Sequence, residues 1–225
     1  AIQNVFAPQV YTRMFGQRDK DGSTIGSYLT PFAYISTGAA LFVVLFSEEI
    51  ITILTPSTYH EAIDITIVLS LMYALMFFGK ITQLLYTKKT GLISFLTFSS
   101  LIILIGAMIP SIRAWGTIGA AWGMFIGTTI SGIISFVISQ RYYPIQWEYQ
   151  RLAGIYGILF ISACGLLLFR SFPVDYIARV IFKLVMIFIY WNIGVRIGIL
   201  KKILLLTFVR VFSGFFFSKR SSLHQ

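Results

Sequence analysis

The stretch Ile109-Pro110-Ser111-Ile112-Arg113-Ala114-Trp115-Gly116-Thr117-Ile118-Gly119-Ala120-Ala121-Trp122-Gly123 is a short polar turn between two long apolar runs. From its end onward, small residues recur at every fourth position: Gly119, Gly123, Gly127, Ser131, Ser135 and Ser139. Residues at this spacing share one face of a helix, so they form a ridge that carries little side chain. Such ridges let membrane helices pack closely. The stretch therefore indicates a polytopic membrane protein.

The composition points to the same class of protein. Of the 225 residues, 57% are hydrophobic and only 12% are charged, and the mean hydropathy is +0.82. Ordinary soluble domains carry roughly 25% charged residues. The apolar residues fall into six blocks, and a membrane-spanning helix needs roughly 20 apolar residues. The length of the chain therefore indicates how many membrane helices it can form, and not how many soluble domains it contains.

The sequence predicts an all-α fold with about six transmembrane helices. We expect them over residues 29–46, 63–86, 91–109, 117–139, 152–169 and 180–200. A membrane β-barrel would need strands of about ten residues that alternate apolar and polar positions. Runs such as Leu101-Ile102-Ile103-Leu104-Ile105 are continuously apolar, which argues against a barrel.

The distribution of Lys and Arg predicts the orientation, because cytoplasmic loops retain positive charge. Twelve fall on one side: Arg13, Arg18, Lys20, Lys88, Lys89, Arg141, Arg151, Lys201, Lys202, Arg210, Lys219 and Arg220. Arg113, Arg170 and Arg179 fall on the other side, and Lys80, Lys183 and Arg196 lie within helices. The segment 47–62 contains three Glu and no Lys or Arg, so we place it on the outer side of the membrane. Both ends of the chain are then cytoplasmic, and the net charge of +10 is a topology signal rather than a sign of nucleic-acid binding.

The two ends of the chain differ from the predicted bundle at 29–200. Residues 1–28 look like the end of an earlier helix followed by a cytoplasmic connection, so we expect the chain to be a fragment that lacks upstream sequence. Residues 201–225 form a basic tail, and its apolar part 203–217 is interrupted by Arg210. An interfacial helix fits that tail better than another span.

Several motifs in the first 140 residues together resemble one transporter family. The first is an apolar helix end with Pro8. The second is a loop with Tyr59 and Ala62 in the pattern of a G-x-x-Y-x-x-A turn, in which Pro56 stands at the usual Gly. The basic turn Lys88-Lys89 and the connection from Ile109 to Ala121 follow. The connection is similar to an IP-x-x-G-x-x-GAA motif, with a longer spacing from Pro to Gly. The order resembles the polysaccharide exporter or O-antigen flippase branch of the multidrug, oligosaccharidyl-lipid and polysaccharide flippase superfamily.

This resemblance implies a transporter of two helical lobes around a central cavity, of which the chain would form mostly the second lobe. It implies flipping of undecaprenyl-pyrophosphate-linked oligosaccharides across the bacterial inner membrane by alternating access, for synthesis of surface polysaccharides such as O-antigen. The implied partners are this lipid-linked anionic oligosaccharide, the membrane lipids, and polysaccharide polymerase and glycosyltransferase machinery. No cofactor, metal or nucleic acid is expected.

Lys80, Tyr73 and Gln83 are the candidate substrate-binding residues. They belong to one polar stripe of the predicted helix 63–86, which consists of Ser70, Tyr73, Phe77, Lys80, Gln83 and Thr87. A cation in the cavity would offset the hydration that a pyrophosphate loses when it leaves water. The opposing interpretation is that Lys80 lies near the cytoplasmic end of its helix and extends to the lipid headgroups.

Other polar residues have simpler explanations. Lys183 and Arg196 lie near helix ends, so we expect both to extend to the headgroups. Asp64 lies at a helix end, where a solvated position is expected, and Cys164 stands alone and can form no disulfide within the chain.

Two other functions stay open. A multidrug exporter of the same superfamily would favour intramembrane carboxylates and an aromatic cavity. A multispanning lipid-modifying enzyme would need a reactive His and Asp pair, and His60 and His224 are the only histidines. We therefore do not expect an enzyme.

Overall fold

Long apolar helices dominate the computed structural model, which describes residues 25–76, 82–172, 175–196 and 198. In order, the elements are α2 (Ile25–Leu54), a short 3-10 helix (Ser57–Tyr59), α3 (Ala62–Leu75), α4 (Thr82–Tyr86), α5 (Thr90–Tyr142), α6 (Tyr149–Ser171) and α7 (Tyr176–Arg196). No strand occurs among these described residues. By length and composition, α2, α5, α6 and α7 can each cross a membrane. The predicted all-α fold is confirmed, as is the expectation of several apolar helices.

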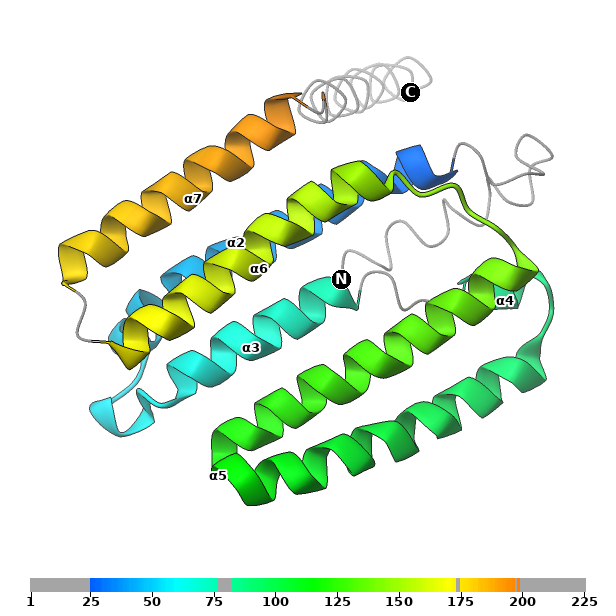
Figure 1. Cartoon of the computed structure of the whole chain (residues 1–225), viewed down its shortest axis with the longest axis horizontal. Coiled ribbons are helices and arrows are strands. Elements are labelled where there is room, and N and C mark those ends of the chain that lie inside the picture. The colour runs from blue at the N-terminus through cyan, green and yellow to red at the C-terminus, as the bar shows by residue number, and fades with distance from the viewer. Residues whose placement is uncertain (1–24, 77–81, 173–174, 197, 199–225) are drawn as a thin grey trace, which may run out of the picture.

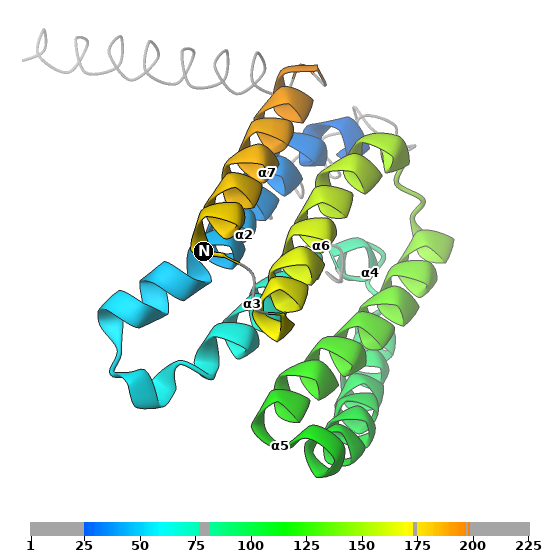
Figure 2. The ribbon, with the colours of Figure 1, turned by 60° about the vertical axis from the view of Figure 1, so that its left-hand side comes forward.

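The helices are arranged in layers (Figure 1). α2 packs against α3 and α6, α7 packs mainly against α6, and α3 separates this group from α5. Figure 2 shows the same order from another direction, with α7 and the α5 hairpin on opposite sides. The main core contains side chains from α2, α3, α6 and α7, among them Leu45, Ile67 and Leu159. A second core lies where the start of α2 meets the connection between α5 and α6.

α5 is a hairpin of two helical arms that meet at Gly116. Its backbone there has φ 61° and ψ −133°, which a glycine adopts without the clash that a Cβ atom would cause. The glycines of the small-residue ridge on the second arm pack on the first arm. A Cβ atom on Gly119 would lie 1.9 Å from the carbonyl oxygen of Ser111, and one on Gly127 would lie 2.9 Å from the Cα of Leu104. The packing role predicted for Gly123 and Gly127 is confirmed, whereas Ser131 and Ser135 line a cavity.

Two predicted boundaries are wrong. The expected outer loop at 47–62 begins later, because α2 continues through Glu48 and Glu49 to Leu54. The helix can include both carboxylates since they pair with cations of α7. The predicted helix 63–86 is interrupted, because α3 ends at Leu75 and a turn follows at Met76. The Tyr156 hydroxyl of α6 donates to the Ala74 carbonyl at 3.1 Å, which satisfies an acceptor in the last turn of α3.

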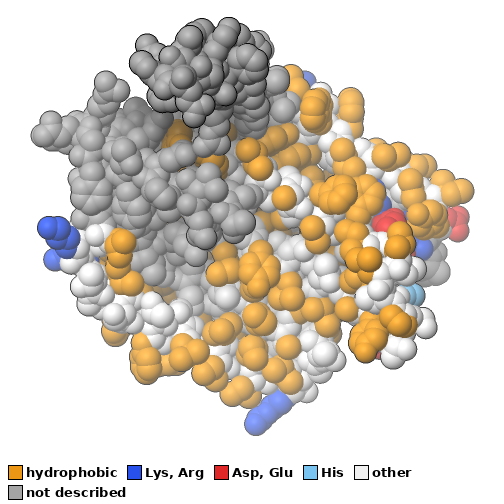
Figure 3. Space-filling view, turned by 180° about the vertical axis from the view of Figure 1, so that it is seen from behind, with side chains coloured by type: hydrophobic (Ala, Val, Ile, Leu, Met, Phe, Trp, Pro, Cys, Tyr) orange, Lys and Arg blue, Asp and Glu red, His pale blue; other side chains and the backbone are white. Residues whose placement is uncertain are grey.

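Apolar side chains cover much of the outer surface (Figure 3). On α7, Ile177, Leu184 and Phe188 are 73%, 60% and 68% exposed. On α5, Phe95 and Phe98 are also largely exposed. Monomeric soluble proteins rarely expose such continuous apolar surface, whereas lipid tails can cover it. Most of the expected connection at 1–28 and the whole basic tail at 201–225 lie outside the described residues. Residues 25–28 of that connection already belong to α2.

Candidate functional site

The structure separates the predicted site residues that it describes. Tyr73 on α3 is 64% exposed, whereas Gln83 on α4 is 4% exposed. Neither side chain lines the large cavity described below. Lys80 lies outside the described residues, so its predicted role remains a prediction from the sequence. Tyr73 and Gln83 therefore do not form one binding surface.

Gln83 is part of an amide cluster that fixes the connection between α5 and α6. Its Nε2 donates to the Gln140 Oε1 at 2.9 Å and to the Tyr143 carbonyl at 2.6 Å. Gln140 in turn donates to the Ile145 carbonyl at 2.9 Å and accepts from the Ile145 N–H at 2.8 Å. The polar groups at the turn into α6 are thus satisfied away from water, which explains why a glutamine is buried here.

A large cavity lies between α3, the two arms of α5 and the first half of α6. Its volume is about 1180 Å³. The end of α3 contributes Met72, Leu75 and Met76, and α6 contributes Leu152 and Tyr156. The cavity exists because α5 packs on α3 and leaves space beside α6. Its volume exceeds the roughly 300 to 1,000 Å³ that is typical of small-molecule sites.

The cavity wall is mostly apolar and carries a set of hydroxyl groups. They belong to Ser94, Thr97, Ser100, Thr128, Thr129, Ser131 and Ser135, all on α5. Thr97, Thr128 and Ser131 donate to carbonyls of their own helix. Each of these oxygens keeps accepting capacity, because a hydroxyl has one donor and two lone pairs. The wall can therefore contact an apolar chain and also accept hydrogen bonds from a polar ligand.

No charged side chain lines this cavity among the residues that the structure describes, and aromatic side chains form part of its wall. The aromatic residues are Phe98, Phe136, Trp147, Tyr149 and Tyr156. Because apolar and aromatic groups dominate, the described wall favours the apolar part of a ligand. It offers no cationic partner for a phosphate.

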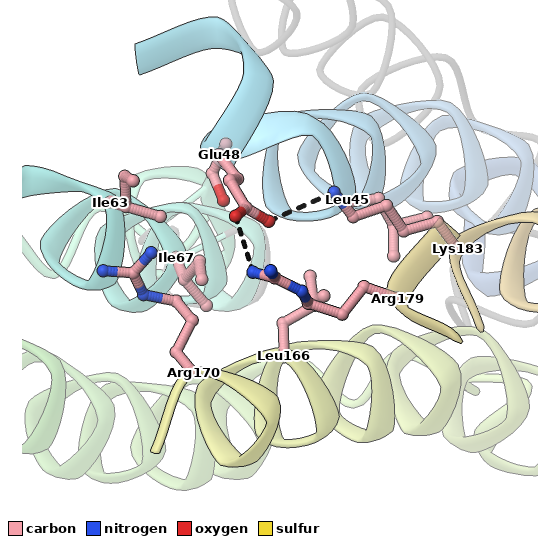
Figure 4. Close-up of a pocket in the computed structure, with 9 residues that line it drawn as sticks. Leu45, Glu48, Ile63, Ile67, Leu166, Arg170, Arg179 and Lys183 are labelled. Atoms are coloured by element: carbon pink, nitrogen blue, oxygen red, sulfur yellow. Dashed lines mark hydrogen bonds and ion pairs between the residues drawn. The ribbon is translucent and has the colours of Figure 1, made fainter. Parts of the chain in front are cut away.

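The charged groups gather instead at one end of the bundle, where α2 and α6 end and α3 and α7 begin (Figures 1 and 4). Arg179 donates to Glu48 with 2.6 Å between the Nη1 and Oε1 atoms. The Nζ of Lys183 lies 2.5 Å from Glu49 Oε1 and 3.7 Å from Glu48 Oε2. On the neighbouring helices, Arg170 Nε lies 2.5 Å from Asp64 Oδ1. We call these six residues the ionic cluster.

The ionic cluster corrects two sequence-based expectations. Lys183 does not extend to the headgroups, because its side chain is 3% exposed and paired with both Glu48 and Glu49. Asp64 pairs with Arg170 and is not a freely solvated helix end. The sequence contains one indication of this pairing. Arg179 and Lys183 lie four residues apart on one helix face, at the side of the membrane where the two glutamates are also predicted.

Three comparisons with known proteins bear on the identity of this site. No protein-family model matches the chain, and neither does any curated protein or solved structure.

Proposed function

We propose that this protein flips a lipid-linked anionic oligosaccharide across the bacterial inner membrane, as the sequence resemblance implies. In this proposal the chain has about six membrane spans and forms the second lobe of a two-lobed transporter, with both of its ends in the cytoplasm. The observation that carries the proposal is the cavity of about 1180 Å³ between α3, α5 and α6, whose wall is apolar but bears hydroxyl groups.

The two halves of the proposed substrate need different surroundings. A polyprenyl chain is compatible with an apolar wall, since contact with it exposes no polar group of the protein. A sugar needs acceptors and donors, because an unsatisfied hydroxyl in an apolar medium costs roughly 1 to 3 kcal/mol by protein mutational data. The hydroxyls of α5 supply acceptors beside the apolar surface. Such a mixed wall supports an amphiphilic substrate better than a purely apolar one.

The pyrophosphate group needs a cation, and Lys80 is the sequence-based candidate for it. Lys80→Gln should complement poorly in cells whose surface glycan depends on this protein, whereas Lys80→Arg should complement better. Surface glycan and the amount of protein in the membrane are measured together. Full glycan with Lys80→Gln would show that Lys80 only extends to the headgroups, and loss of the protein itself would assign it a structural role.

The cavity can be tested separately by filling it. Ser135→Phe places a large side chain on the cavity wall, so glycan export should fall about tenfold or more while the protein is retained in the membrane. Val137→Phe is the matched control, because Val137 lies nearby on the same arm, is 47% exposed and does not line the cavity. Equal export by both variants would remove the cavity from the transport path.

A multidrug exporter is the second candidate, and one observation favours it. The described cavity wall combines aromatic side chains with no charged residue, which suits apolar drugs. Cells that express the protein should then tolerate apolar drugs better than cells without it, and Ser135→Phe should abolish that tolerance. Drug tolerance without any effect on surface glycan would decide for this second function.

A further inference from the structure

The ionic cluster joins helices at one end of the bundle only. Its pairs link α2 to α7 and α3 to α6. At the opposite end, the ion pair among described residues is the local one between Glu148 and Arg151, at i and i+3 of α6. Hydrogen bonds join the elements there instead, from Gln83 to Gln140 and from Thr30 of α2 to Glu148. Ion pairs between helices therefore hold one end of the bundle together, and hydrogen bonds hold the other.

The pairs between α2 and α7 leave some hydrogen-bonding capacity unused. Within the structure, the Oε2 of Glu49 and the Nε of Arg179 are buried without a hydrogen-bond partner. Lys183 is shared between two carboxylates at unequal distances. Buried ion pairs come close to break-even, because desolvation offsets their attraction. An incompletely satisfied cluster is therefore a poor general stabiliser and well suited to opening and closing.

α7 has a second contact with α2, formed by Tyr34 and Tyr190. Each hydroxyl donates to the backbone carbonyl of the other residue, at 2.5 Å from Tyr190 and 3.3 Å from Tyr34. The rings stack with their centroids 4.6 Å apart. These groups are uncharged, so they keep their partners when the charges of the cluster are changed. The two tyrosines therefore hold α7 against α2 further along α7, away from the end with the ionic cluster.

A small cavity of about 10 Å³ lies beneath the charged groups, and Figure 4 shows Arg170, Arg179 and Lys183 directed toward it. Ser47 of α2 also lines this cavity and is only 1% exposed. Ser47 therefore lines the same small cavity as Glu48, Arg179 and Lys183. Separation of α7 from α2 at this end would expose Ser47.

We propose that Glu48, Glu49, Arg179 and Lys183 form a latch that closes this end of the bundle, and that α7 turns about the Tyr34 and Tyr190 contact when the latch opens. The latch is independent of the substrate proposed above, because it rests on contacts between helices. Neutralising all four residues removes the attraction without leaving any one charge unpaired. The open state should then become more populated while the bundle stays folded.

The test uses the full chain in lipid nanodiscs, where both faces are accessible, with Cys164→Ala and one new cysteine, Ser47→Cys. A membrane-impermeant maleimide should label this cysteine slowly. Adding Glu48→Gln, Glu49→Gln, Arg179→Gln and Lys183→Met should raise the labelling rate about tenfold, equivalent to ~1.4 kcal/mol. Neutralising the other end with Glu148→Gln and Arg151→Gln is the matched control and should leave the rate unchanged.

A second cysteine distinguishes a latch from general loosening. Ser162 of α6 is 0% exposed and lies away from the cluster, so Ser162→Cys should stay unlabelled in the neutral variant. Unchanged labelling at position 47, or an equal rise at both positions, would overturn the proposal. If the fourfold variant fails to fold, the pair Glu48→Gln with Arg179→Gln should still give a partial rise at position 47. No rise in that pair would also overturn it.

Discussion

Tyr34 and Tyr190 show how single polar groups determine helix position inside a membrane protein. Each is buried, and each hydroxyl donates to a backbone carbonyl on the opposite helix. Gly194 provides the room, since a Cβ atom there would lie 2.2 Å from the Tyr34 hydroxyl oxygen. Interhelical hydrogen bonds in membranes contribute ~0.6 kcal/mol on average and up to ~1.7 kcal/mol. This pair therefore fixes α7 against α2 with modest energy and well-defined geometry.

The two hydroxyls should differ in their contribution to stability. Tyr190→Phe removes the shorter bond, so we expect the free energy of unfolding to fall by about 1 kcal/mol. Tyr34→Phe removes the longer bond and should cost less, while the ring stacking is retained in both variants. Unfolding in mixed detergent micelles, followed by circular dichroism, measures both changes. Equal effects of the two substitutions would show that the bond lengths do not reflect bond strength.

At the scale of the element, the α5 hairpin depends on three glycines of its second arm. Gly123 approaches the Cα of Met108, where a Cβ atom would lie only 2.7 Å away. Gly119 and Gly127 approach the first arm just as closely. All three are buried, although most of α5 is not. The two arms therefore pack through backbone contact, which residues larger than glycine would prevent at these positions.

Gly123→Leu should separate the arms and lower the yield of folded protein severalfold, because overpacking commonly costs 1 to 3 kcal/mol. Gly106→Leu is the matched control: Gly106 is exposed on the first arm, and no atom lies within 4 Å of a Cβ atom placed there. Size-exclusion chromatography of detergent-solubilised protein gives the folded fraction. A normal elution profile for Gly123→Leu would contradict the packing role of the ridge.

At the scale of the whole molecule, the two ends of the bundle carry charges of different kinds. Lys88, Lys89 and Arg141 flank the hairpin at the end where α5 begins and ends. The opposite end holds the ionic cluster, in which each described cation is paired with a carboxylate. Unpaired positive charge is the kind that cells retain on the cytoplasmic side. The charge pattern therefore favours a cytoplasmic location for the end with Lys88.

Cysteine labelling in intact cells tests that orientation. In a Cys164→Ala background, Ser57→Cys should react with an impermeant reagent, whereas Lys88→Cys should react only after the membrane is opened. Both residues are exposed, so access to them depends on the side of the membrane and not on burial. The reverse pattern, with position 88 labelled and position 57 protected in intact cells, would invert the proposed topology.

The sequence predicted the parts of this fold that follow from local pattern. Apolar blocks located the helices, and the four-residue spacing of small residues identified the packed face of α5. The pairing of Glu49 with Lys183 was not predicted, because it joins positions far apart in the chain and depends on how α2 meets α7. For the same reason the sequence pattern suggests Gln83 as a substrate ligand, although Gln83 donates hydrogen bonds to Gln140 and Tyr143.

The turn at Gly116 has a consequence for how the protein is made. Between Thr90 and Gln140 the chain contains a single charged residue, Arg113, which lies just before the turn. Since the two arms contact each other through their own backbones, they can leave the translocation machinery as one preformed pair. Only one charged side chain then has to be carried to the far side of the bilayer. The close backbone contact between the arms makes the hairpin suited to insertion as a single unit.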